Sequence, residues 1–96
     1  MNVVLTQPVE IALRTLGPEE RRQVSAWLDH LKNWENDPFV REHSHKLESA
    51  EGVYVLRTSS DFRIFFELHE DQIVVLDIAT KATLMKFGRL AGQGHS

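Results

Sequence analysis

The sequence predicts one α+β domain, in which a small antiparallel sheet is covered on one face by two helices. Its length of 96 residues allows one modest core and no more. Residues 54–78 hold three short apolar runs, separated by polar turns at 59–61 and 70–71. Because such short connections reverse the chain between neighbouring strands, this stretch predicts a three-stranded meander. Upstream, the apolar residues follow helical spacing.

The N-terminal residues predict a strand followed by a first helix. Residues 2–5 are a short apolar run. Thr6 offers a hydroxyl for a helix cap, and Pro8 suits a first turn, where a missing N–H costs no hydrogen bond. Gly17 and Pro18 then end this helix and begin the next.

The second helix has the clearest pattern in the chain. One continuous apolar stripe recurs at i, i+3, i+4, i+7 and i+10, formed by Val24, Trp27, Leu28, Leu31 and Trp34. Such a stripe beside a sheet indicates core packing rather than a partner groove. We expect Trp27 and Leu31 to pack over Phe66 and Leu76.

Residues 39–52 show no strong period and predict a connector. They hold the densest group of positive and titratable side chains, namely Arg41, His43, His45 and Lys46. The histidines lack further ligands at a helpful spacing, so we expect no metal site. His43 suits a solvated loop, whereas His45 and Lys46 lead directly into the first meander strand.

Alternation along the meander divides its side chains between two faces. The face predicted to join the core carries Tyr54, Leu56, Phe62, Ile64, Phe66, Leu68, Val74, Leu76 and Ile78. The opposite face carries Arg57, Arg63, Phe65, Glu67, Val75 and Asp77. This mixture of charges and one aromatic ring is compatible with a functional surface. It is equally compatible with cross-strand ion pairs, each contributing under about 1 kcal/mol when exposed.

The C-terminal residues allow a short helix or a final strand. Leu84, Phe87 and Leu90 are spaced by three, and Lys81 and Lys86 add positive charge. The run from Leu84 to Leu90 is more apolar than a free tail requires, which predicts a surface covered by a partner. Residues 91–96 predict a flexible tail.

The composition bounds the class of protein. The formal net charge of −3 counts against a large nucleic-acid footprint but not against a small basic patch. No cysteine is present, and no apolar run approaches the roughly 20 residues that span a bilayer. With no basic and apolar leader at the N-terminus, we expect a cytoplasmic protein without cofactors.

The ordered set of motifs resembles the RelE/ParE superfamily of bacterial toxins. His45-Lys46-Leu47 leads into the strand that ends at Arg57, and Phe62-Arg63 and residues 73–76 follow. The resemblance covers residues 5 to about 87 and implies a sheet-and-helix toxin domain. It also implies a type II toxin–antitoxin system, in which a cognate antitoxin wraps and inactivates the toxin.

For the RelE-like branch, the resemblance implies a ribosome-dependent endoribonuclease that cuts messenger RNA by metal-free attack of a ribose 2′-OH. Arg63 would clamp the phosphate, Arg57 would supply a second cation, and His45 and Asp61 match a histidine and an aspartate of one sub-branch. Lys46, Lys81 and Lys86 are the candidate substrate-binding cations. One alternative stays open: a protein of the same fold that cleaves nothing, either a ParE-like gyrase inhibitor or a degenerate toxin that only binds an antitoxin.

Overall fold

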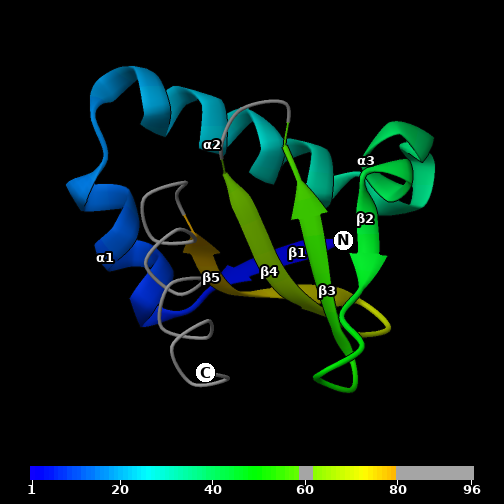
Figure 1. The fold of residues 1–96 in the computed structure, drawn as a ribbon. Coiled ribbons are helices and arrows are strands. Elements are labelled where there is room, and N and C mark those ends of the chain that lie inside the picture. The colour runs from blue at the N-terminus through cyan, green and yellow to red at the C-terminus, as the bar shows by residue number, and fades with distance from the viewer. Residues whose placement is uncertain (59–61, 80–96) are drawn as a thin grey trace, which may run out of the picture.

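The strands of the protein form one mixed sheet, and its helices lie on one side of that sheet (Figure 1). The computed structural model describes residues 1–58 and 62–79. In chain order the elements are β1 (Asn2–Leu5), α1 (Gln7–Thr15), α2 (Pro18–Lys32), the short 3-10 helix η1 (Trp34–Asn36), α3 (Pro38–Glu42), β2 (Ser44–Lys46), β3 (Val53–Arg57), β4 (Arg63–Leu68) and β5 (Gln72–Ala79).

The sheet has the strand order β1-β5-β4-β3-β2. The meander of β3, β4 and β5 is antiparallel, as the turn pattern predicts, and β2 extends it antiparallel to β3. β1 lies parallel to β5 at the other edge, from Asn2 opposite Gln72 to Leu5 opposite Val75. The predicted α+β fold is therefore confirmed. No helix within residues 1–58 and 62–79 is long and apolar enough to cross a membrane.

The predicted connector 39–52 contains more regular structure than its sequence indicates. Asp37 starts α3, because its Oδ1 accepts hydrogen bonds from the backbone N–H groups of Phe39 (3.0 Å) and Val40 (3.3 Å). Five residues of helix and three of strand follow. Both elements are too short to show a period, so only their tertiary partners reveal them.

The apolar stripe of α2 enters the core as predicted. Its buried side chains are Val24, Trp27, Leu28 and Leu31. The largest fully buried side chains come from both layers, namely Phe66, Leu31, Leu56, Ile64, Ile73, Val9, Val24, Val40 and Val75. Burial of these groups is the main source of stability for a domain of this size.

The two tryptophans have different partners. Trp27 is 8% exposed, and its ring stacks on Phe39 with centroids 5.4 Å apart. The ring placed edge-on to Phe66, at 5.7 Å, belongs to Trp34, and Phe66 stacks in turn on Tyr54. A tryptophan ring does pack on Phe66, as expected, but it is the ring of Trp34 and not that of Trp27.

A β-bulge interrupts the pairing of β4 with β5. The register shifts between Phe65 and Phe66, which leaves Leu76 of β5 as an extra residue. The hydroxyl of Thr6 lies 2.9 Å from the carbonyl oxygen of Val75 and 3.0 Å from that of Leu76. Thr6 does precede α1, but its side chain makes no cap hydrogen bond. It links the start of α1 to the bulge instead.

The bulge changes which residues of β5 face the core. Ile73 and Val75 are fully buried before it, and Ile78 is buried after it. The prediction that Val74 and Leu76 face inward is therefore wrong, as is the outward placement of Val75. Strict alternation fails here because one inserted residue turns every earlier side chain of the strand to the other face.

A hydrogen bond between His30 and Asp37 joins the end of α2 to the start of α3. The His30 Nδ1 and Asp37 Oδ2 atoms are 2.6 Å apart. This hydrogen bond is the largest cause that holds the pKa of Asp37 below its usual 3.8, and the capping N–H groups of Val40 and Phe39 act in the same direction. The same carboxylate thus caps one helix and binds the other.

Replacing Trp27 by alanine should lower the free energy of unfolding by about 3–5 kcal/mol, since it empties a large buried aromatic site. Urea denaturation monitored by circular dichroism measures the change. Ile11→Ala is the matched control, because Ile11 is 50% exposed and should cost far less. A loss below about 1 kcal/mol for Trp27→Ala would contradict the core assignment.

Asp37 should make stability depend on pH. Its pKa is depressed by folding, so its stabilisation is fully present above the unfolded-state pKa and is lost as the pH falls through the folded-state pKa. Asp37→Asn keeps the cap oxygen but removes the charge. The wild-type advantage over this variant should shrink as the pH falls below about 4, where the Asp37 carboxylate gains a proton. Urea midpoints of both proteins across this range provide the test, and a difference that does not change with pH would refute it.

Candidate functional site

The face of the sheet opposite the helices carries the charged residues of the meander. Directly paired residues of antiparallel strands place their side chains on the same face, with Cβ atoms about 4.5–5.5 Å apart. The strand register therefore defines this surface, which we name the open face. Its paired members on β2 to β5 are His45, Val53, Val55, Arg57, Arg63, Phe65, Glu67, Val74, Asp77 and Ala79.

Two arginines stand side by side on the open face. Arg57 of β3 pairs directly with Arg63 of β4. Within residues 1–58 and 62–79, no carboxylate forms an ion pair with either guanidinium. Arg63 Nη1 reaches only the carbonyl oxygen of Phe62, at 3.4 Å. Like charges placed directly opposite each other destabilise a sheet, so stability alone does not account for this pair.

The carboxylates of the open face have other partners. Glu67 Oε1 lies 3.4 Å from His69 Nε2, and Asp77 Oδ1 accepts a hydrogen bond of 2.8 Å from the backbone N–H of Ile78. The cross-strand ion pairs that the sequence allowed are therefore not formed in the described part of the chain. Among residues 1–58 and 62–79, no side chain neutralises either arginine.

A second row of the open face runs beside the arginines. The register places His45, Val55, Phe65 and Asp77 next to one another across β2, β3, β4 and β5. His45 is exposed on the edge strand, and Phe65 is half-buried in the middle of the row. The sequence motifs assign no site role to Phe65 or Asp77. The available signal was the i, i+2 spacing of Arg63 and Phe65, which puts both on one face of one strand.

Lys46 is separated from the arginines. It pairs with Tyr54, whose side chain belongs to the helix-covered face. Together with Tyr54 and Leu68 it lines a cavity of about 480 Å³ at the end of the sheet. Three other predicted site residues, Asp61, Lys81 and Lys86, lie outside the described residues, as do the apolar run 84–90 and the tail 91–96.

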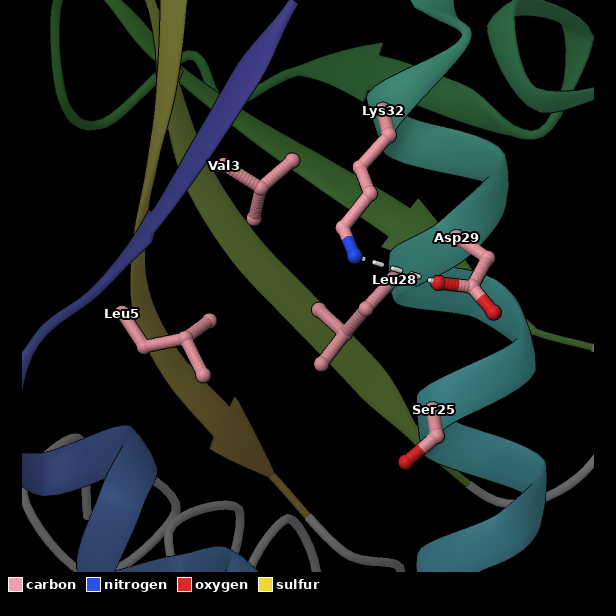
Figure 2. Close-up of a pocket in the computed structure, with 6 residues that line it drawn as sticks. All are labelled: Val3, Leu5, Ser25, Leu28, Asp29 and Lys32. Atoms are coloured by element: carbon pink, nitrogen blue, oxygen red, sulfur yellow. Dashed lines mark ion pairs between the residues drawn. The ribbon is translucent and has the colours of Figure 1, made fainter.

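An apolar groove lies on the other side of the molecule, between β1 and α2. Figure 2 shows Val3 and Leu5 of β1 and Leu28 of α2 pointing toward one another across it. Its volume is about 200 Å³, and its remaining lining residues are Ser25, Asp29 and Lys32. The Lys32 Nζ and Asp29 Oδ1 atoms are 3.4 Å apart at its rim. An apolar floor with a charged rim beside an edge strand suits an interaction with protein.

The open face combines two arginines that can bind an anion with a histidine that can exchange a proton. Two guanidinium groups on neighbouring strands can donate parallel hydrogen bonds to the oxygens of a phosphate. His45, one row away, carries a side chain that can act as acid or base near neutral pH. No cluster of three or more His, Asp or Glu side chains in residues 1–58 and 62–79 could hold a metal ion.

Comparison with known proteins identifies the fold. No protein-family model matches the sequence, and no curated protein matches it. A RelB–RelE antitoxin–toxin complex from Methanococcus jannaschii matches with a TM-score of 0.68 at 12% identity, over 88% of this chain and 96% of that chain. An archaeal RelE–RelB complex from Pyrococcus horikoshii OT3 matches with a TM-score of 0.64 at 23% identity, over 83% of this chain and 93% of that chain. The isolated E. coli RelE toxin matches with a TM-score of 0.63 at 16% identity, over 93% of this chain and 97% of that chain. Over nearly their whole length, the chains share one fold.

Proposed function

We propose that this chain, which has the RelE-like toxin fold, is the toxin of a type II toxin–antitoxin system and cuts messenger RNA on the ribosome. The observation that carries the proposal is the directly opposed pair Arg57 and Arg63, which has no carboxylate partner among the described residues. A phosphodiester is an anion that such a pair suits. The fold shared with RelE toxins supports the same conclusion by analogy.

The proposed reaction needs no metal ion. The ribose 2′-OH loses a proton and attacks the adjacent phosphorus, and the bond from phosphorus to the 5′-oxygen breaks as that oxygen gains a proton. Arg63 and Arg57 stabilise the extra negative charge that develops on the phosphoryl oxygens. His45 serves as the base or the acid, and Asp61, which the sequence motif suggests, is the candidate for the other role.

We further propose that a cognate antitoxin binds the groove between β1 and α2. The matched RelE proteins from M. jannaschii and P. horikoshii were solved in complexes with RelB. Among the described strands, β1 lies at one edge of the sheet. An extended segment of a partner can pair with this strand while placing apolar side chains on Val3, Leu5 and Leu28. An antitoxin segment bound in this groove would not cover the open face. Another segment of the antitoxin would have to block that face.

Arg63→Ala should slow cleavage of messenger RNA by about 10²–10³-fold, roughly 3–4 kcal/mol of barrier, because the opposed charge grows in the transition state. Arg63→Lys should restore only part of the rate, since an ammonium group lacks the planar fork. Growth arrest and messenger-RNA integrity after induction in bacteria measure the effect.

Arg22→Ala is the matched control, because the Arg22 side chain is 79% exposed on α2, away from the open face. Thermal melts establish that each variant is folded, and Arg63→Ala should melt no earlier than the wild type, since it relieves a like-charge contact. Growth arrest with intact messenger RNA would instead favour the non-cleaving alternative, including a ParE-like gyrase inhibitor. Full cleavage by a folded Arg63→Ala protein would remove Arg63 from the catalytic residues.

Co-expression with the product of the neighbouring open reading frame should yield a stable complex and restore growth. Ser25→Arg, on the rim of the groove, should weaken that complex at least about tenfold, because a bulky charge obstructs the groove without disturbing the core. Gln23→Arg is the control, since it adds the same charge to α2 at an exposed position that does not line the groove. Pull-down and calorimetry measure both variants, and equal affinities would place the antitoxin elsewhere.

A further inference from the structure

The start of α3 is held by a side chain that the proposed reaction does not use. The Oδ2 atom of Asp37 lies 2.6 Å from Nδ1 of His30, which belongs to the last turn of α2. Because an ionised carboxylate only accepts hydrogen bonds, the imidazole donates this one. The other carboxylate oxygen, Oδ1, caps α3 by accepting from the N–H groups of Phe39 and Val40. One short hydrogen bond therefore ties the start of α3 to the end of α2.

The helix α3 needs such a tie because it is short. A helix of five residues is not stable by itself. Among its residues only Val40 is buried, so the core holds the helix at one point. The ring of Phe39, although 45% exposed, lies 5.4 Å from that of Trp27 and 5.6 Å from that of His30. His30 thus contacts both the cap and the first turn of α3, which limits how far the helix can tilt about Val40.

The other end of α3 leads directly to two residues of the proposed site. The carbonyl oxygen of His43, its C-cap residue, accepts a hydrogen bond of 2.8 Å from the backbone N–H of Arg57. β2 begins at the next residue, Ser44, whose hydroxyl donates to the carbonyl oxygen of Val40 at 2.8 Å. His45 follows on β2, which continues from α3 and lies beside β3 (Figure 1). A tilt of α3 would therefore move the backbone of Arg57 and of His45.

We propose that His30 is a positioning residue for the proposed cleavage site, because it fixes α3 and thereby the places of Arg57 and His45 on the open face. This inference rests on the proposed function. His30 acts only through Asp37 and α3 and needs no contact with RNA. Catalysis is sensitive to such links, since a displacement of about 1 Å can lower a rate by about 10²-fold.

Two substitutions break the tie in different ways. His30→Leu removes the donor, and it should leave the core intact because the His30 side chain is 42% exposed. Asp37→Ser keeps an oxygen that can cap α3, but its side chain is too short to reach His30 as well. His30→Asn places an amide N–H near the position of Nδ1 and should restore the tie. If both residues act through one bond, the double variant His30→Leu with Asp37→Ser should be no worse than either single variant.

Arg21→Ala is the matched control. Arg21 also joins α2 to a neighbouring helix, because its guanidinium donates to the carbonyl oxygens of Leu13 (3.1 Å) and Leu16 (3.2 Å) at the end of α1. α1 carries none of the proposed site residues. Thermal melts of all variants measure the loss of stability, so the control shows what losing a link between helices does through stability alone.

Hydrogen exchange of the whole protein measures the tie without any RNA. The Arg57 amide should exchange at least about tenfold faster in His30→Leu and Asp37→Ser than in the wild type, relative to the amides of β4. The reason is that its hydrogen bond to His43 opens when α3 tilts. His30→Asn and Arg21→Ala should leave its exchange close to the wild-type rate. An Arg57 amide that exchanges equally fast in every variant would refute the proposal.

Cleavage of messenger RNA on ribosomes measures the consequence. His30→Leu and Asp37→Ser should lower kcat by about 10- to 100-fold. KM should stay within about threefold of the wild type, because both arginines keep the charge that attracts RNA. His30→Asn should recover most of kcat, and Arg21→Ala should change neither constant by more than about twofold.

The failure of this inference can be told apart from the failure of the proposed function. If the wild type does not cut RNA, the proposed function is wrong and the positioning role falls with it. If the wild type cuts RNA and His30→Leu cuts equally fast while the Arg57 amide exchanges faster, the nuclease proposal stands and the positioning role is refuted. Equal losses of kcat in His30→Leu and Arg21→Ala would show that stability alone is responsible, and would also overturn it.

Discussion

The in-register pairing of β4 with β3 is the constraint on which the rest of this structure depends. It places Ile64 opposite Leu56 on the core face, where both side chains are fully buried. The same register places Arg63 opposite Arg57 on the other face. Burial of the apolar pair strongly fixes the register, because a slip of β4 by one residue would turn Ile64 outward and Arg63 inward. The stability of the core thereby holds two like charges together that would otherwise separate.

The second link between core and open face is the bulge in β5. Thr6 contacts its carbonyl groups from the junction of β1 and α1, so the helical layer is tied to the strand that carries Asp77. Bulges commonly re-aim a side chain near a functional site. Here the extra residue, Leu76, lets Ile73 and Val75 join the core while Asp77 remains on the open face. The hydroxyl that the sequence suggested as a helix cap has this connecting role.

The two faces of the molecule separate two kinds of recognition. The open face offers permanent charge, one aromatic ring and a titratable edge residue, which suits an anionic strand. The groove between β1 and α2 offers aliphatic side chains such as Val3 and Leu28 and a rim with one ion pair, which suits another protein chain. A net charge of −3 is compatible with this division, because the positive charge that matters is local to Arg57 and Arg63.

The sequence by itself determined the meander, the apolar stripe of α2 and the face to which Arg63 belongs. Each follows from periodicity, which a stretch of chain shows without its partners. It did not reveal β2 or α3, because three and five residues are too few for a period. Tertiary structure alone decided that Leu76 bulges, that Lys46 lies on the helix-covered face and that Phe65 stands beside Asp77. Register and bulges are properties of two strands together, so no single stretch of sequence contains them.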